Sequence, residues 1–321
     1  MSQATPRQLN PRGPFADLTD FGDDQPLDAA SAKIAWIIFG GLVLALVAAY
    51  FNMLRFTATH WAMDMYSHGY IVPAFAAYLF WIRRRPLVNA EPLQRWIGVG
   101  IVAVCLGVRV WAATVDMNPV DRLSFIGALL GVCLIVGGTS MLKWAGLPIL
   151  FLLFMYPLPA VLENTLLVKL QTVASIMSTF VLQTLGVSAS RVGNRIDVDT
   201  LSEALEVAQA CSGLRMLTIF GAMCVAMVMI TERPWWDKLV ILLSIIPIAL
   251  VSNVIRIVAT ALLYLAFGQE TGWLNSIIHD WAGFAMMPIG LLLLWIELAV
   301  LSRLTIPLDN EDFVPFGAAT A

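Results

Sequence analysis

Residues 239–267 read LVILLSIIPIALVSNVIRIVATALLYLAF, a stretch with no acidic side chain and a single arginine, Arg256. About 20 apolar residues in a helix span a bilayer, so this stretch predicts a transmembrane helix. Of the 321 residues, 59% are hydrophobic and 13% are charged, and the mean hydropathy is +0.80. Soluble proteins carry about 25% charged residues. The composition therefore predicts a polytopic membrane protein. The sequence contains no basic stripe, so no nucleic acid partner is expected.

We expect an all-α membrane protein with about eight transmembrane helices and a small extracytoplasmic insert. The candidate spans are residues 34–54, 66–82, 96–114, 123–142, 146–162, 211–230, 239–267 and 279–301. The polar, Asp-rich residues 1–33 predict a disordered cytoplasmic tail, and residues 303–321 predict a short second one. The first apolar stretch starts late and is long enough to span, so it predicts a signal anchor and not a cleavable signal peptide.

Lys and Arg in short loops predict the orientation, because such loops remain in the cytoplasm. They place loops 83–95, 142–145 and 231–238 inside, and alternation then places four segments outside: 55–66, 115–122, 163–210 and 268–278. Four chemically interesting residues consequently gather at or near the outer surface: His68, Cys211, Arg256 and His279. The orientation was derived from Lys and Arg of the short loops, so none of these four residues contributed to it.

The outer segment 163–210 has two parts. Residues 165–185 mix apolar with polar side chains, which fits an interfacial amphipathic helix; a further span stays open. Residues 186–208 have strand character around the turn Gly193-Asn194, a pattern that predicts a β-hairpin. The sequence therefore predicts a small extracytoplasmic hairpin shortly before Cys211.

The motif Cys211-Ser212-Gly213-Leu214-Arg215 opens one span. In a helix Cys211 and Arg215 share a face, and a nearby cation or a helix N-terminus favours the reactive thiolate. Gly213 would leave room for a substrate backbone. The alternative is a small buried cysteine beside an arginine that snorkels to the surface.

Arg256 lies deep in its span, with Asn253 three residues earlier on the same helical face. A guanidinium there needs a partner or a water-filled cavity. It could bind a substrate carboxylate or carbonyl groups, or stabilise the oxyanion of an acyl-transfer intermediate. The alternative is a structural bond to carbonyl groups of a neighbouring helix.

Two histidines are candidate proton carriers. His279 opens the last span, and His68 stands in Tyr66-Ser67-His68-Gly69 as a second candidate base or substrate-positioning group; a helix-cap role for His279 stays open. His60 looks like an ordinary interfacial residue. No paired ligand spacing indicates a metal site, and no motif indicates a cofactor. The other cysteines, Cys105, Cys133 and Cys224, lie in apolar stretches, where inert thiols are expected.

Taken in order, Ala210-Cys211-Ser212-Gly213-Leu214-Arg215, Asn253-x-x-Arg256 and His279 resemble the motifs of the exosortase/archaeosortase family of membrane transpeptidases. Tyr66-Ser67-His68-Gly69, followed by Pro73, resembles the early motif of bacterial exosortases. The resemblance covers residues 34–302. It implies that Cys211 is the nucleophile and that Arg256 and His279 are its catalytic partners. We expect a group of substrate-binding or supporting residues, comprising Arg215, Asn253, His68, Ser212 and Gly213. Gln209 departs from the acidic residue expected two positions before the cysteine.

The resemblance also implies a substrate and a location. The substrates would be exported proteins with a C-terminal sorting signal, made of a Pro-Glu-Pro-like motif, an apolar helix and a basic tail. Cleavage and transfer to an unknown envelope acceptor would occur at the periplasmic face of the bacterial inner membrane, in contact with lipid.

Two other functions stay open. One is a non-enzymatic membrane component of exopolysaccharide export or assembly, in which Cys211 only packs. The other is a secondary transporter with Arg256 as an anion site, although the internal hydropathy repeat common in transporters is not evident. Tolerance of a Cys211→Ser substitution would separate both of these functions from a transpeptidase.

Overall fold

A computed structural model describes residues 26–201, 204–206, 213–231, 233–268 and 272–304. These residues form mostly helices and one small sheet. Five helical stretches are long and apolar enough to cross a membrane: Ala29–Ala49, Pro92–Val115, Asn118–Met155, Val161–Thr184 and Trp235–Phe267. Met216–Ile230 is a shorter apolar helix. The predicted class, a helical membrane protein, is confirmed, but the described residues do not reproduce the count of eight spans.

The N-terminal segment holds more helix than predicted. Helix α1 (Ala29–Ala49) begins where the Asp28 carboxylate accepts hydrogen bonds from two backbone N–H groups, and α2 (Phe51–Trp61) follows directly. The first half of the predicted outer segment 55–66 is therefore helical, which its sequence did not indicate. A polar sequence with a narrow apolar stripe formed a surface helix. The predicted span 66–82 divides into the 3-10 helix η2 (Asp64–Tyr70) and the short α3 (Ile71–Arg83).

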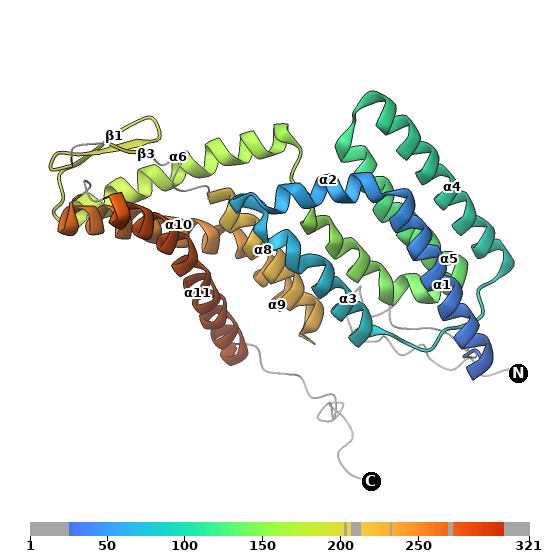
Figure 1. Ribbon diagram of the computed structural model, residues 1–321. Coiled ribbons are helices and arrows are strands. Elements are labelled where there is room, and N and C mark those ends of the chain that lie inside the picture. Colours follow the sequence, from blue (N-terminus) through green and yellow to red (C-terminus); the bar gives the residue numbers. More distant parts are fainter. Residues whose placement is uncertain (1–25, 202–203, 207–212, 232, 269–271, 305–321) are drawn as a thin grey trace, which may run out of the picture.

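A long helical stretch, α5 (Asn118–Phe151), follows α4 (Pro92–Val115) and leads into η3 (Leu152–Met155). It breaks at Gly138, where φ is 61° and ψ is −156°, and the chain reverses its direction there (Figure 1). Only glycine adopts this conformation readily. The side chain of Gln94 accepts a hydrogen bond from the freed Thr139 N–H at 3.2 Å. The turn predicted at 142–145 is therefore displaced to Gly138.

Helix α6 (Ala160–Thr184) leads into an antiparallel sheet of three strands, β1 (Ala189–Val192), β2 (Arg195–Val198) and β3 (Leu205–Glu206). Gly193-Asn194 forms the two-residue connection between β1 and β2, and φ of Gly193 is 64°. The predicted hairpin and its turn are confirmed. The third strand was not predicted, because two residues are too few to produce an alternating pattern.

The C-terminal part consists of α8 (Gly213–Ile230), α9 (Trp235–Leu243), α10 (Ile245–Phe267) and α11 (Gly272–Leu304). Helices α9 and α10 meet at Ser244, so the predicted span 239–267 contains a junction near its start. Helix α10 packs against α6, α8 and α11.

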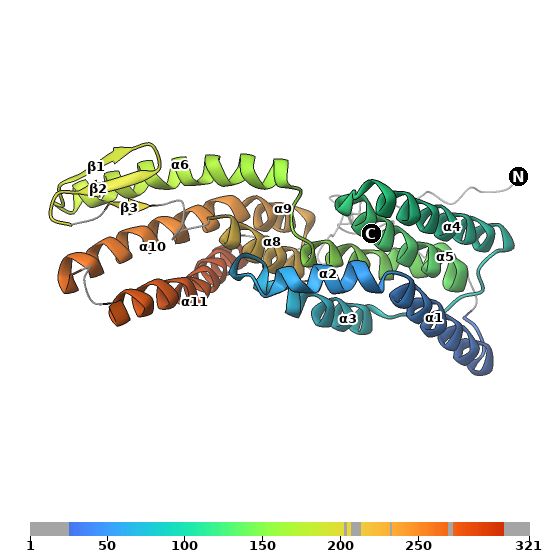
Figure 2. The same cartoon turned by 45° about the horizontal axis from the view of Figure 1, so that its top comes forward.

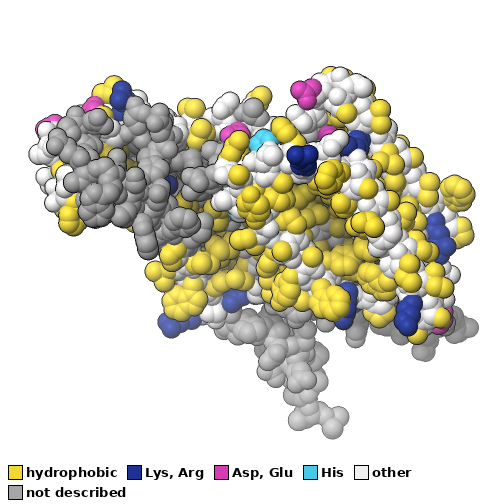
Figure 3. All heavy atoms as spheres, viewed as in Figure 1, with side chains coloured by type: hydrophobic (Ala, Val, Ile, Leu, Met, Phe, Trp, Pro, Cys, Tyr) yellow, Lys and Arg dark blue, Asp and Glu magenta, His cyan; other side chains and the backbone are white. Residues whose placement is uncertain are grey.

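The helices give the molecule two distinct ends (Figures 1 and 2). The sheet, α2, α6 and the α4–α5 turn lie at one end, and α2 and α6 run across it. The C-terminal ends of α3 and α11 lie at the other end, with the break in α5. In Figure 3 a broad apolar surface lies between these ends, and Lys and Arg side chains line its lower edge.

Candidate active site

The middle of α10 buries an unusual set of polar side chains. Ser252, Asn253 and Arg256 are 0%, 1% and 5% exposed. The Ser252 hydroxyl and both amide atoms of Asn253 are buried without a hydrogen-bond partner. Arg256 takes part in neither of two ion pairs between described residues, Arg109–Asp121 and Arg233–Asp237. An unpartnered buried polar group costs about 1–3 kcal/mol, so this face of α10 does not serve stability alone.

The start of α8 carries the predicted nucleophile motif. Cys211 and Ser212 lie outside the described residues. Gly213 and Arg215 lie in the first turn of α8, where the structure describes the backbone alone. A helix N-terminus presents unpaired N–H groups and a positive partial charge, which favour an anion in front of it.

The register between α8 and α10 places this helix start near the buried polar face. A Cβ at Gly221 of α8 would lie 3.9 Å from Ile245 Cγ2 of α10, so these two positions are in contact. The helices run antiparallel, and eight residues lead from Gly221 back to Gly213 and from Ile245 on to Asn253. At about 1.5 Å per residue, both paths cover roughly 12 Å. Asn253 and the start of α8 therefore lie at a similar level.

Helix α11 supplies the third predicted catalytic residue. His279 lies in its first third, where the structure describes the backbone and not the side chain. Gly290 faces the Phe220 ring of α8 so closely that no Cβ would fit between them. Helix α11 also lies alongside α10 (Figure 2). The helix that bears His279 thus packs on both helices of the other motifs.

His68 is placed by a contact with the chain between α5 and α6. Its Nε2 lies 3.1 Å from the Phe154 carbonyl oxygen, while Nδ1 is buried without a partner. Burial lowers the pKa of His68 below its ordinary value of about 6.5, so the ring is neutral at neutral pH. The segment η2 that holds it packs against α8 and η3.

A polar cluster beside His68 was missed in the sequence. Tyr66 donates its hydroxyl hydrogen to the Glu163 carboxylate at 2.9 Å, and burial raises the pKa of Tyr66, which keeps this donor protonated. Arg122, 8% exposed, donates to the Pro157 carbonyl at 3.2 Å. The nearby Tyr156 hydroxyl is buried without a partner. The sequence did indicate this cluster, because a charged residue, Arg122, lies at the start of an apolar stretch.

A sequence model of the transmembrane exosortase family matches residues 60–296. The chain belongs to the transmembrane exosortase family. The resemblance to this family is thereby confirmed, and the matched residues extend from the end of α2 into α11. No match is found among curated proteins or among solved structures.

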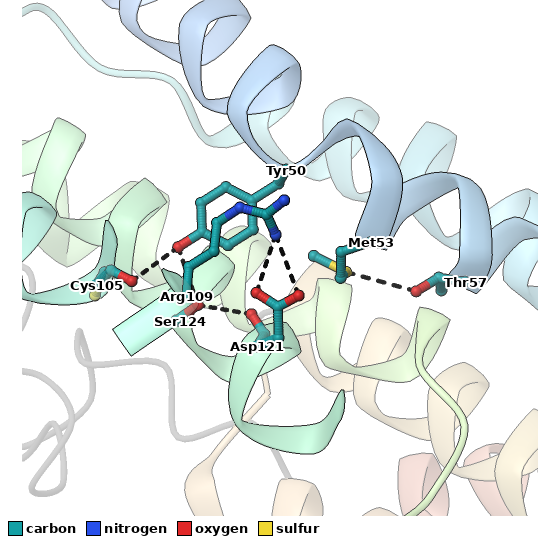
Figure 4. Close-up of polar contacts among 7 residues, drawn as sticks. All are labelled: Tyr50, Met53, Thr57, Cys105, Arg109, Asp121 and Ser124. Carbon is teal, nitrogen blue, oxygen red and sulfur yellow. Dashed lines mark hydrogen bonds and ion pairs between the residues drawn. The ribbon is translucent and has the colours of Figure 1, made fainter. Parts of the chain in front are cut away.

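In this exosortase a second polar network joins α1, α4 and α5 (Figure 4). The Arg109 guanidinium lies 3.1 Å from both carboxylate oxygens of Asp121 and 4.4 Å from the centre of the Tyr50 ring. The Tyr50 hydroxyl contacts the Cys105 carbonyl at 3.1 Å and the Ser124 hydroxyl at 2.9 Å. These contacts bind three helices together near the end of the molecule that holds the α4–α5 turn. Sequence reasoning passed over Arg109, although the rule that selected Arg256 applies to it equally.

Proposed function

We propose that this exosortase is a membrane cysteine transpeptidase that cleaves C-terminal sorting signals of exported proteins. Membership of the family supports the reaction class. One structural observation carries the assignment of the site: the unpartnered Asn253 and the buried Arg256 lie level with the start of α8, two residues after Cys211 in the sequence. Buried polar groups that bond to no described residue are available to a substrate.

The first half-reaction forms a thioester. His279 accepts the proton of Cys211, and the thiolate attacks the carbonyl carbon of the scissile peptide bond. Arg256 and the N–H groups at the start of α8 stabilise the oxyanion of the tetrahedral intermediate. The C–N bond then breaks, His279 returns the proton to the leaving amine, and the apolar helix and basic tail of the signal depart. The new carboxyl terminus remains on Cys211.

The second half-reaction releases the product. An amine or hydroxyl of an envelope acceptor, or water, attacks the thioester carbonyl, and the C–S bond breaks. Asn253 hydrogen-bonds the substrate backbone in both steps, since its amide offers one acceptor and two donors. Arg215 and Ser212 support the nucleophile, and Gly213 gives the substrate access. Transfer takes place at the periplasmic face of the bacterial inner membrane, where a substrate helix in the bilayer would present its scissile bond.

The test uses a tagged protein that ends in a Pro-Glu-Pro-type sorting signal, incubated with membranes that contain wild type, Cys211→Ala or Cys211→Ser. Wild type shortens the substrate by the mass of the signal, and neither variant does. Cys224→Ala is the matched control, because Cys224 is a buried free thiol in α8, the helix that follows Cys211. Normal processing by both Cys211 variants would refute the proposal and favour a non-enzymatic role.

A further inference from the structure

The ring of His68 is held in one tautomer. The Phe154 carbonyl oxygen can only accept a hydrogen bond, so the His68 Nε2 at 3.1 Å must carry the hydrogen. In the neutral ring the lone pair then stays on Nδ1. A base in an enzyme is fixed in the same way, by a hydrogen bond to the nitrogen that does not react.

The Nδ1 atom of His68 is buried and bonds to no partner. Burial keeps the ring neutral near pH 7, and so this lone pair is available as a base. His60 offers a contrast in the same part of the chain. Its Nδ1 lies 2.9 Å from the Phe56 carbonyl oxygen of its own helix, so that nitrogen is already engaged.

Contacts on either side hold the His68 segment in place. The Trp61 indole N–H donates to the Met155 carbonyl at 2.8 Å, one residue after the carbonyl that binds His68. Gly69 packs so closely on the Trp61 ring that no side chain would fit there. These carbonyls lie at the end of the α5–η3 helical stretch, where the negative end of the helix dipole would stabilise a protonated imidazole.

The His68 segment also packs on α8, the helix whose start carries the proposed site. The ring of Phe154, whose carbonyl binds His68, lies 3.5 Å from the Cβ position of Gly221, eight residues after the start of that helix. Figures 1 and 2 show η2 on the α3 side of α8, with α10 and α11 on the other side. A base on η2 can therefore serve a group that arrives on a different side of α8 from the helix bearing His279.

We infer that His68 is the general base of the transfer step, a role that rests on the function proposed above. The acceptor amine or hydroxyl attacks the thioester carbonyl on Cys211 while its proton passes to His68 Nδ1. The C–S bond then breaks, the product leaves as an amide or ester, and the proton moves from His68 to the thiolate. His279 protonates the departing amine, and His68 takes the proton of the incoming nucleophile.

The experiment separates the two half-reactions in single-turnover measurements on the full-length protein in detergent. His68→Gln keeps an N–H donor for the Phe154 carbonyl but has no basic lone pair. It should cleave the tagged substrate at nearly the wild-type rate and then accumulate the thioester. Its release to water or to glycinamide should fall about 10²–10⁴-fold, the usual contribution of a general base. His60→Gln is the matched control and should release product normally.

Hydroxylamine distinguishes a lost base from a damaged site. It is a strong nucleophile that needs little proton removal before attack, so it should discharge the thioester of His68→Gln nearly as fast as that of wild type. Added imidazole should restore part of the release by His68→Ala. Wild-type release by His68→Gln would overturn the inference, and so would an equal loss of cleavage and release. Absence of any thioester in wild type would instead overturn the proposed function, and this inference with it.

Discussion

Replacing Arg109 or Asp121, and so removing their ion pair, should destabilise the protein by a predictable amount. At 3.1 Å and an effective dielectric constant of about 20, their attraction is about 5 kcal/mol before desolvation. The two side chains are 18% and 13% exposed, so the pair lies between exposed pairs, at about 0.2–1 kcal/mol, and buried pairs, whose disruption costs about 3–5 kcal/mol. We therefore expect a coupling energy of about 2 kcal/mol.

The assay is a double-mutant cycle on Arg109→Met, Asp121→Asn and the double variant, with SDS-driven unfolding of the detergent-solubilised protein. Each single substitution should lower the free energy of unfolding by about 2–4 kcal/mol, and the double variant should lose less than their sum. Arg95→Met is the control, since Arg95 lies at an exposed site and should change stability by less than about 0.5 kcal/mol.

A coupling energy below about 0.5 kcal/mol would refute this reasoning. It would mean that water screens the pair as at an exposed surface, and that Arg109 stabilises the fold mainly through its stacking on Tyr50. An unchanged free energy of unfolding in both single variants would show that the network does not hold α1, α4 and α5 together.

Other substitutions follow from the same contacts. Gly138→Ala should lower the free energy of unfolding by at least about 2 kcal/mol in the same assay, because φ is 61° there, whereas Gly100→Ala, in open space, should be neutral or stabilising. Gly290→Ala should push α11 from the Phe220 ring and lower substrate cleavage at least tenfold; normal cleavage would show that this contact does not position the site. Burial lowers the pKa of His68, so the unfolded state binds its proton first. Wild type should lose stability as the pH falls below about 6.5, and unfolding midpoints at pH 7.5 and 5.0 should show a smaller loss in His68→Gln.

Features encoded by local sequence were predictable. The Gly193-Asn194 connection appears where two short runs of β-branched residues flank a turn pair, and local turn chemistry determines such hairpins. Arg256 was recognisable because a charge inside an apolar stretch is costly. Its burial together with Asn253 follows from helical periodicity, since residues three apart share a face.

Features that depend on tertiary contacts were not predictable from periodicity. The reversal at Gly138 depends on Gln94, a residue of another helix, which accepts a hydrogen bond from the broken turn. The free Nδ1 of His68 depends on the Phe154 carbonyl, which lies 86 residues away in the sequence. Hydropathy treats the polar residues of α2 as loop, although a helix that lies across the end of the bundle needs only a narrow apolar stripe.

The most direct test is to locate the acyl group on the enzyme. Wild type is mixed with the tagged substrate, quenched in acid during turnover, digested and examined by mass spectrometry. The account predicts that the new carboxyl terminus of the substrate is attached to the peptide containing Cys211, and that hydroxylamine removes it. Substrate cleavage without an adduct on that peptide, or an adduct on another residue, would contradict it.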